Sequence, residues 1–177
     1  MRKIIVAILL MTAIMACTSI DCPVQNLVYT QYAIMKSDGT PDTLNTDTIW
    51  IWTTRVDDTD TLVLSSSYES HTLVLNSLYG SNTTTFALPI SNTLPEDVFY
   101  LLLRDTLQQE YIDTFVVQKE DFPHFESVDC QASYFHELKA VSTTHHTIDS
   151  ISIHYSEVNY DLSKTHFYIY FKAASER

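Results

Sequence analysis

The chain has 177 residues, of which 45% are hydrophobic, and a formal net charge of −12 at pH 7. This length suits one domain with a substantial core, and the acidic balance argues against binding to nucleic acid or anionic lipid. Only two glycines occur, Gly39 and Gly80, so neither a glycine-rich phosphate loop nor a GxSxG nucleophile turn can be formed. Nucleotide binding by those routes and α/β-hydrolase chemistry are thereby excluded, and we expect no cofactor.

Residues 1–16 have the features of an export signal. Arg2 and Lys3 precede an apolar run over residues 4–15, about a dozen residues and too short to span a bilayer. The sequence Ile14-Met15-Ala16-Cys17 resembles the lipobox of bacterial lipoproteins. That resemblance implies cleavage before Cys17 and its lipidation, and hence a membrane partner. The alternative is an ordinary signal peptide followed by an unrelated cysteine.

Two further cysteines predict a disulfide. With Cys17 lipidated, Cys22 and Cys130 remain, and an even pair in an exported protein is typical of a bond. A free reactive thiol is the alternative. Residues 17–27 would form a short tether, and the five residues from lipid to disulfide reach at most ~18 Å. One end of the domain should therefore lie near the membrane.

The surroundings of the two cysteines lead to more specific expectations. Cys130 falls in a strand-like run with Val128 and Ala132 at same-face spacing, so its sulfur should point into the core. Cys22 should then lie at an edge of the fold, just before the first strand.

Residues 28–177 predict one β-sandwich domain. Around ten short strands rich in Thr, Val, Ile and Tyr, separated by polar turns, are typical of a single antiparallel, immunoglobulin-like sandwich. The expected strands cover residues 28–36, 48–55, 61–65, 72–78, 83–88, 98–104, 110–118, 127–141, 147–155 and 165–172. Turns are expected at residues 37–42, 57–60 and 122–125, and residues 108–111 have the composition of one helical turn.

Four aromatic residues are candidates for binding: Trp50, Trp52, Tyr168 and Tyr170. One face of each sheet in an antiparallel sandwich is solvated, and aromatic side chains there would stack on sugar rings or on a partner protein. The alternative is that the tryptophans cover the core or close a sandwich edge, as large aromatic residues usually do.

Motifs for metal binding and catalysis are incomplete. If Asp58 in the acidic run at residues 57–60 is the first position of a calcium loop, Asp60 is third and Glu69 twelfth, but Leu62 and Val63 stand where a ligand and a glycine belong. The segment His136-Glu137-Leu138-Lys139-Ala140 begins like HExxH but lacks the second histidine. We expect no metal site and assign no catalytic residue.

A group of four scattered residues has no ligand spacing of its own. Only the fold could bring these residues together, and they are His124, Asp129, His145 and His146. Scattered surface histidines are the commoner case, so this group does not change the expectation of no metal site.

A short pattern, Asp-Ser/Thr-aliphatic, recurs through the chain. Its hydroxyl residues are Thr43, Thr48, Thr61, Thr106 and Ser150. The pattern resembles the acceptor motif of protein O-glycosylation in Bacteroidota. It also fits strand entry, where a solvated Asp precedes a β-branched residue and then a core residue.

Three blocks together carry a family resemblance. They are Cys17-Thr-Ser-Ile-Asp-Cys22-Pro, His124-Phe-Glu-Ser-Val-Asp-Cys130 with Phe135-His136, and Thr147-Ile-Asp-Ser-Ile151. The chain resembles a family of small Bacteroidota lipoproteins of unknown function. The resemblance implies no activity or substrate.

The residues after Cys17 bear on localisation. Thr18 in place of Asp resembles the Gram-negative signal for transfer to the outer membrane. Asp21 is the one acid before Cys22, whereas surface export in Bacteroidota resembles a rule needing an acidic run. We therefore expect a domain that faces the periplasm.

These features favour a non-enzymatic, lipid-anchored envelope module that binds an unknown protein or glycan partner. The alternative is an envelope hydrolase whose acidic site is assembled by the fold, because paired carboxylates have no sequence spacing of their own.

Overall fold

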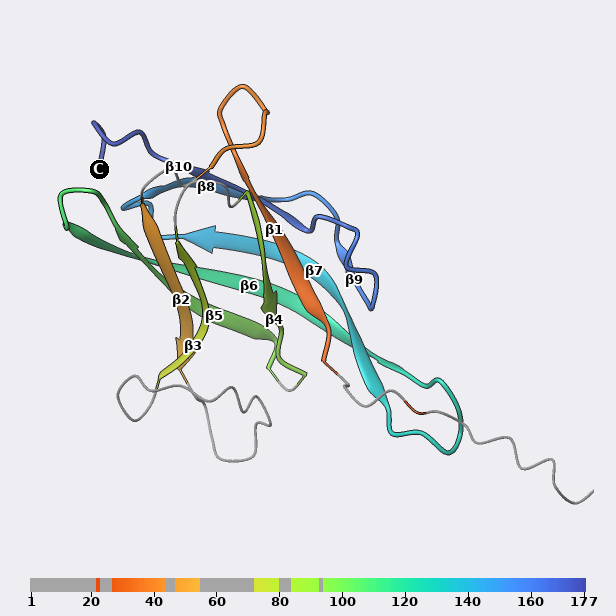
Figure 1. The fold of residues 1–177 in the computed structure, drawn as a ribbon. Coiled ribbons are helices and arrows are strands. Elements are labelled where there is room, and N and C mark those ends of the chain that lie inside the picture. The colour runs from red at the N-terminus through yellow and green to blue at the C-terminus, as the bar shows by residue number, and fades with distance from the viewer. Residues whose placement is uncertain (1–21, 23–26, 44–46, 55–71, 80–83, 93) are drawn as a thin grey trace, which may run out of the picture.

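A computed structural model describes residues 22, 27–43, 47–54, 72–79, 84–92 and 94–177. This part of the chain forms strands and no helix (Figure 1). The strands are β1 (Tyr29–Met35), β2 (Thr48–Thr54), β3 (Thr72–Tyr79), β4 (Thr85–Pro89), β5 (Glu96–Arg104), β6 (Glu110–His124), β7 (Ser133–Thr143), β8 (Ile148–Ile153), β9 (Glu157–Val158) and β10 (Phe167–Phe171).

The strands make two packed sheets, which confirms the predicted sandwich. One sheet has four strands in the order β4-β1-β10-β8, and the other has six in the order β3-β2-β5-β6-β7-β9. Pro89 is the last residue of β4, an edge strand, where the missing N–H removes no interior ladder bond.

Burial alternates along the strands, even in β5, where the continuous apolar run over residues 99–103 predicts burial on both faces. In β5, Phe99, Leu101 and Leu103 are buried while the residues between them are only partly covered. An aromatic cluster closes the core: Tyr32 of β1 stacks on Phe86 and Phe167 at 4.8 and 4.7 Å between ring centroids. The Tyr32 ring also meets the edge of Phe115, at 5.9 Å, which joins the two sheets.

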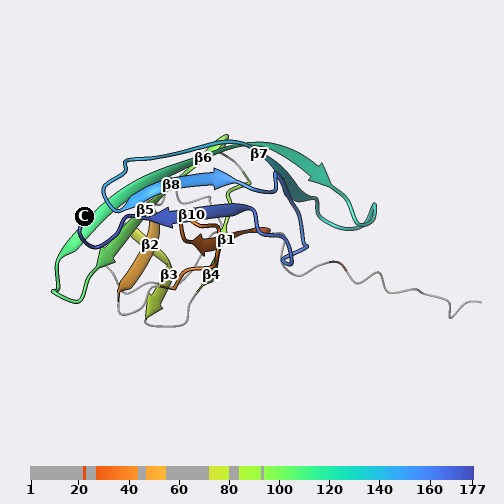
Figure 2. The ribbon, with the colours of Figure 1, turned by 90° about the horizontal axis from the view of Figure 1, so that it is seen from above.

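The β6–β7 hairpin is the longest element and extends past the sandwich. The pairing of β5 with β6 ends at Glu96 and Gln118, so β6 continues from Lys119 to His124 with β7 as its neighbour. Figure 2 shows this hairpin as a long curved ribbon whose end projects beyond the four-stranded sheet.

One strand pair departs from the antiparallel expectation. β1 and β10 are parallel, with Tyr32 opposite Phe167 and Ile34 opposite Ile169. Alternation along a strand specifies which side chains face the core, but it carries no information on the direction of the neighbouring strand.

The region around residues 122–141 also differs from the prediction. Residues 122–124 are the end of β6 instead of a turn, and β7 begins at Ser133 instead of residue 127. The chain reverses over residues 125–132, so Cys130 lies in the connection and not in a strand. Pro123 is tolerated because this part of β6 pairs with β7 alone.

The structure differs from the prediction in two smaller elements, the turn at residues 108–111 and the strand β9. Residues 108–111 form no helical turn, because the Asp105 carboxylate accepts hydrogen bonds from the backbone N–H groups of Leu107 and Gln109 and closes a tight turn into β6. Gln108 adopts a positive φ of 63° there. The two-residue strand β9 was not predicted, since it is too short to show a periodic pattern.

Some predictions fall on residues outside the described ranges: the signal segment, Cys17, Thr61, the acidic run at 57–60 and the strand at 61–65. Within the described ranges, no helix is long and apolar enough to cross a membrane.

Candidate functional site

The outer face of the six-stranded sheet carries the two tryptophans. Ile49 and Ile51 of β2 are fully buried, so the alternating Trp50 and Trp52 point away from the core. In the register with β5, Trp50 is opposite Leu102 and Trp52 is opposite Tyr100. Residues directly opposite one another share a face, which brings these four side chains together.

The same face continues onto β6. Ile112 lies opposite Leu102 and is 50% exposed. We call Trp50, Trp52, Tyr100, Leu102 and Ile112 the tryptophan patch. The other four members are half-buried, so each presents part of its apolar surface to solvent instead of packing in the core.

Ring contacts order the tryptophan patch. Trp52 and Tyr100 stack at 5.7 Å between centroids, and the guanidinium of Arg104 lies 4.8 Å from the ring centroid of Trp50. The same guanidinium pairs with the Glu110 carboxylate. The result is an aromatic and aliphatic centre with a charged pair at its border.

Tyr168 and Tyr170 lie elsewhere. They alternate with buried Phe167 and Ile169 in β10, which places them on the outer face of the four-stranded sheet. The Tyr168 ring stacks on His154 at 4.3 Å. The four predicted binding aromatics are therefore divided between the two opposite outer faces and do not form one site.

A buried ionic cluster occupies the inner face near the projecting hairpin. The Lys119 ammonium donates to Asp121 Oδ1 at 2.8 Å and to the Leu94 carbonyl at 2.6 Å, and lies 3.8 Å from Asp97 Oδ2. Asp121 Oδ1 is also 2.6 Å from His136 Nδ1. The Lys119 and His136 side chains are fully buried, so they depend on partners within this cluster, whereas the Asp121 side chain is 21% exposed.

This environment favours the neutral form of His136. Burial lowers its pKa, the hydrogen bond with Asp121 opposes that effect, and the charge of Lys119 reinforces it. Its Nε2 is buried and has no hydrogen-bond partner within the described part of the chain. The sequence gives no signal for this role of His136, since the HExxH motif that it begins is incomplete.

Next to His136 lies an open cavity of about 470 Å³. Phe122 and Phe135 contribute apolar walls, and Ser156, Glu157 and Asn159 contribute polar ones. The pairing of Asp121 with His136 depends on the hairpin register, so a turn predicted at residues 122–125 hid it.

A larger groove, of about 950 Å³, lies at the opposite end of the sandwich. Three of the predicted glycan acceptors, Thr43, Thr106 and Ser150, line it. Thr48 is close to this end as well, since it pairs with Arg104 next to the β5–β6 turn. The acidic groups of the groove are balanced in part by cations, with Arg177 Nη1 2.6 Å from Asp47 Oδ2.

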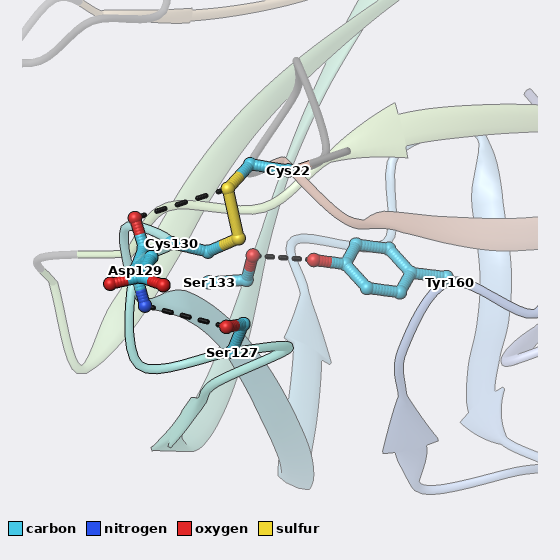
Figure 3. Close-up of a disulfide and its surroundings, with 6 residues drawn as sticks. All are labelled: Cys22, Ser127, Asp129, Cys130, Ser133 and Tyr160. Atoms are coloured by element: carbon cyan, nitrogen blue, oxygen red, sulfur yellow. Dashed lines mark hydrogen bonds between the residues drawn. A yellow bond between two sulfur atoms is a disulfide. The ribbon is translucent and has the colours of Figure 1, made fainter. Parts of the chain in front are cut away.

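Cys22 and Cys130 form a disulfide at the end of the β6–β7 hairpin, with Cα atoms 5.5 Å apart (Figure 3). This agrees with the predicted pairing. The prediction that Cys130 lies in a strand with Val128 was wrong, because both residues belong to the connection and Val128 is 97% exposed. The Cys130 side chain is buried, near the hydrogen-bonded hydroxyls of Ser133 and Tyr160. Cys22 itself is exposed and precedes β1, as expected.

The four scattered candidate metal ligands are not brought together. His124 and Asp129 lie at the hairpin end, where His124 is paired with Glu126 at 3.1 Å. His145 and His146 lie after β7, at the other end of that strand. Among the described residues, no group of three or more histidine, cysteine or acidic side chains could hold a metal ion.

Among the described residues, three acidic side chains have shifted pKa values: Asp38, Asp113 and Asp161. All three pKa values are lowered. Hydrogen bonds from Thr40 lower the pKa of Asp38, and those from Ser163 lower the pKa of Asp161. These carboxylates stay ionised at neutral pH, whereas a general acid needs a raised pKa.

A comparison with protein families matches residues 48–171 to a family of unknown function, DUF6452. No curated protein and no solved structure matches the chain. The matched segment runs from the start of β2 to the end of β10 and contains the whole six-stranded sheet. Because this match covers more than half of the sequence, the chain belongs to the family of unknown function DUF6452.

Proposed function

We propose that this protein is a lipid-anchored module of the bacterial cell envelope that binds a protein or glycan partner through the tryptophan patch. The observation that carries the proposal is the cross-strand clustering of Trp50, Trp52, Tyr100, Leu102 and Ile112 on one outer sheet face. Outer faces of antiparallel sheets are normally polar, so a contiguous aromatic and aliphatic face favours a partner.

The composition of the patch suits binding. Aromatic residues and Arg are enriched at the centres of protein interfaces, where they provide much apolar area with few rotatable bonds. The same rings stack on the apolar faces of sugars. Arg104 and Glu110 border the patch and would orient a polar partner group.

The hydrolase alternative has less support. A hydrolase with paired carboxyl groups would need one acid that stays protonated near neutral pH. The shifted carboxyl groups of the described residues have lowered pKa values instead. The ionic residues of the large groove are also partly engaged with one another, as in the Arg177–Asp47 pair.

Anchoring rests on the lipobox-like sequence before Cys17, and the disulfide is compatible with an oxidising compartment. We place the protein at the outer membrane of a bacterium of the Bacteroidota type, with the domain facing the periplasm. In the native host, Cys17→Ser should release the protein from membranes or leave the signal segment attached. Recovery of the Cys17→Ser variant in the membrane fraction at mature size would contradict lipidation. Digestion of the wild-type protein by protease added to intact cells would contradict the periplasmic orientation.

Partner binding is tested by photo-crosslinking in the native host. A benzophenone amino acid replaces Ile112 in the patch, and in a matched strain it replaces exposed Ser152 on the opposite sheet. We expect a discrete crosslinked product from position 112 that Trp52→Ala reduces at least several-fold, and none from position 152. No product at position 112, or equal products from both faces, would contradict the proposal.

A further inference from the structure

The end of the β6–β7 hairpin is the most projecting part of the described chain. We call residues 122–132 the hairpin tip. It lies past Gln118, where the pairing of β6 with β5 ends, and so stands clear of the sandwich (Figure 2). A projecting connection is ordinarily polar, because connecting segments run over the protein surface in contact with water.

The hairpin tip instead exposes three apolar side chains. Phe125 is 63% exposed and Val128 is 97% exposed, and Phe122, near the end of β6, is also exposed. Behind these residues the tip is firm: His124 stacks on Phe135 at 4.2 Å, and the Cys22–Cys130 disulfide closes it. The exposed apolar side chains are thus presented by a braced element.

The disulfide also fixes what lies next to the tip. Cys22 is bonded at the tip, and Cys17 precedes it by five residues, which span at most ~18 Å. If Cys17 carries lipid, as the proposed function holds, the bilayer surface lies within that distance of Cys22, which is bonded to the hairpin tip that carries Phe125 and Val128. This short tether therefore favours the membrane as the partner of the exposed apolar side chains at the hairpin tip.

We propose that the hairpin tip inserts Phe122, Phe125 and Val128 into the interface of the membrane that holds the lipid anchor. Apolar side chains at the headgroup boundary gain free energy by leaving water, and aromatic rings are favoured at that depth. The tip would hold the sandwich in one orientation, with the large groove and its glycan acceptors at the end facing away from the bilayer.

Charge selects the kind of lipid. Removing Arg2 and Lys3 from a chain of formal charge −12 leaves −14, and the tip itself carries exposed Glu126 and Asp129. Anionic headgroups would repel these groups. The tip therefore suits zwitterionic headgroups, in which the ammonium group can meet the two carboxylates.

The test uses the mature lipidated protein in vesicles of phosphatidylethanolamine and phosphatidylcholine. A diazirine amino acid replaces Val128 in one sample and Leu107 in the other. Leu107 is a matched control because it is 77% exposed in the β5–β6 turn, at the opposite end of β6. Flotation of each sample measures anchoring, and mass spectrometry after illumination measures lipid adducts.

We expect at least ten-fold more lipid adduct at position 128 than at position 107. With the probe at position 125, Val128→Glu should lower the adduct at least five-fold, whereas Leu107→Glu should not change it. Adding phosphatidylglycerol should lower the adduct at position 128. Flotation with equal or no adduct at the two positions would overturn insertion while leaving the anchor intact. Failure to float would overturn the anchor, and insertion with it.

Discussion

The Asp113 carboxylate accepts two hydrogen bonds from Thr147, one from its backbone N–H at 2.6 Å and one from its hydroxyl at 2.7 Å. The backbone N–H of Ile148 donates to the same oxygen at 2.8 Å, and Thr144 and His146 donate to the other oxygen. Asp113 belongs to β6 and Ile148 begins β8, so one fully buried carboxylate joins the two sheets.

We predict that Asp113→Asn is strongly destabilising. An amide has one acceptor oxygen and no charge, so the donors of the β7–β8 connection lose part of their charge-assisted bonding while staying buried. We expect a loss of about 3 kcal/mol in the free energy of unfolding. Urea unfolding followed by circular dichroism measures this loss. Asp105→Asn, in the exposed β5–β6 turn, is the control, and an equal effect of the two changes would contradict the assignment.

Stability should fall in acid, in a window set by Asp113. Burial alone would raise the pKa of this carboxyl, but hydrogen bonds from His146, Thr144, Ile148 and Thr147 lower it to about 2 from 3.8. The unfolded chain therefore binds the proton first as the pH falls. The stabilisation, about 2 kcal/mol, is present above pH 3.8 and is lost as the pH falls through about 2. In urea titrations at several acidic pH values, Asp113→Asn should remove this slope.

Two buried histidines, His136 and His166, should make stability depend on pH in a second, higher range. Burial lowers the pKa of His136 and of His166 from 6.5, and the ring of His166 accepts a hydrogen bond at Nδ1 from the Gln31 N–H. A protonated ring cannot accept that bond. As the pH falls below 6.5, the unfolded chain takes up protons that the folded chain does not, so stability decreases. A constant free energy of unfolding between pH 7.5 and 5 would contradict this.

Lys119 and Lys139 offer a matched comparison of a buried and an exposed ion pair. Each lies near two acidic groups, Asp97 and Asp121 for Lys119, Glu120 and Glu137 for Lys139. Lys119→Met leaves buried carboxylates without their cation and should cost about 3–5 kcal/mol of stability. Lys139→Met removes a solvent-screened pair and should change stability little. Similar effects of both changes on urea midpoints would refute the buried cluster as a structural element.

The disulfide closes a segment with a sequence separation of 108. Replacing both Cys22 and Cys130 by Ser should lower stability by about 4 kcal/mol in the chain-entropy model and should also free the tether from the hairpin tip. Thermal unfolding of the double variant measures the first effect. Recovery of free thiols at both positions from denatured, non-reduced wild-type protein would show that the bond does not form.

If the predicted glycan acceptors at the large groove are used, protein from the native host should show a mass excess. Thr106 is exposed in a turn and should be the most occupied, while Thr48 at the start of β2 should be less accessible. Intact mass spectrometry should show hexose-like increments that Thr106→Ala reduces. A mass equal to polypeptide plus lipid would exclude the modification.

The hydrophobic pattern of the sequence determined most strands and their buried faces. Alternation in residues 165–172 correctly separated the core residues Phe167 and Ile169 from their outward neighbours Tyr168 and Tyr170, whereas the apolar run in residues 98–104 indicated burial on both faces and only one face is buried. With Cys17 assigned to the lipobox-like sequence, counting cysteines was enough to predict the pairing of Cys22 with Cys130. These features are local or arithmetic, so they need no knowledge of which strands become neighbours.

The tertiary structure alone decided the relations between strands. A period of two specifies the face of a side chain but not the partner, direction or register of its strand. For this reason the sequence did not show that β1 runs parallel to β10, nor that the tryptophans and the tyrosines lie on opposite faces. The pairing of Asp121 with His136 requires β6 to continue to His124 and the chain to reverse over residues 125–132, and the period of two within one strand does not show where its partner strand begins.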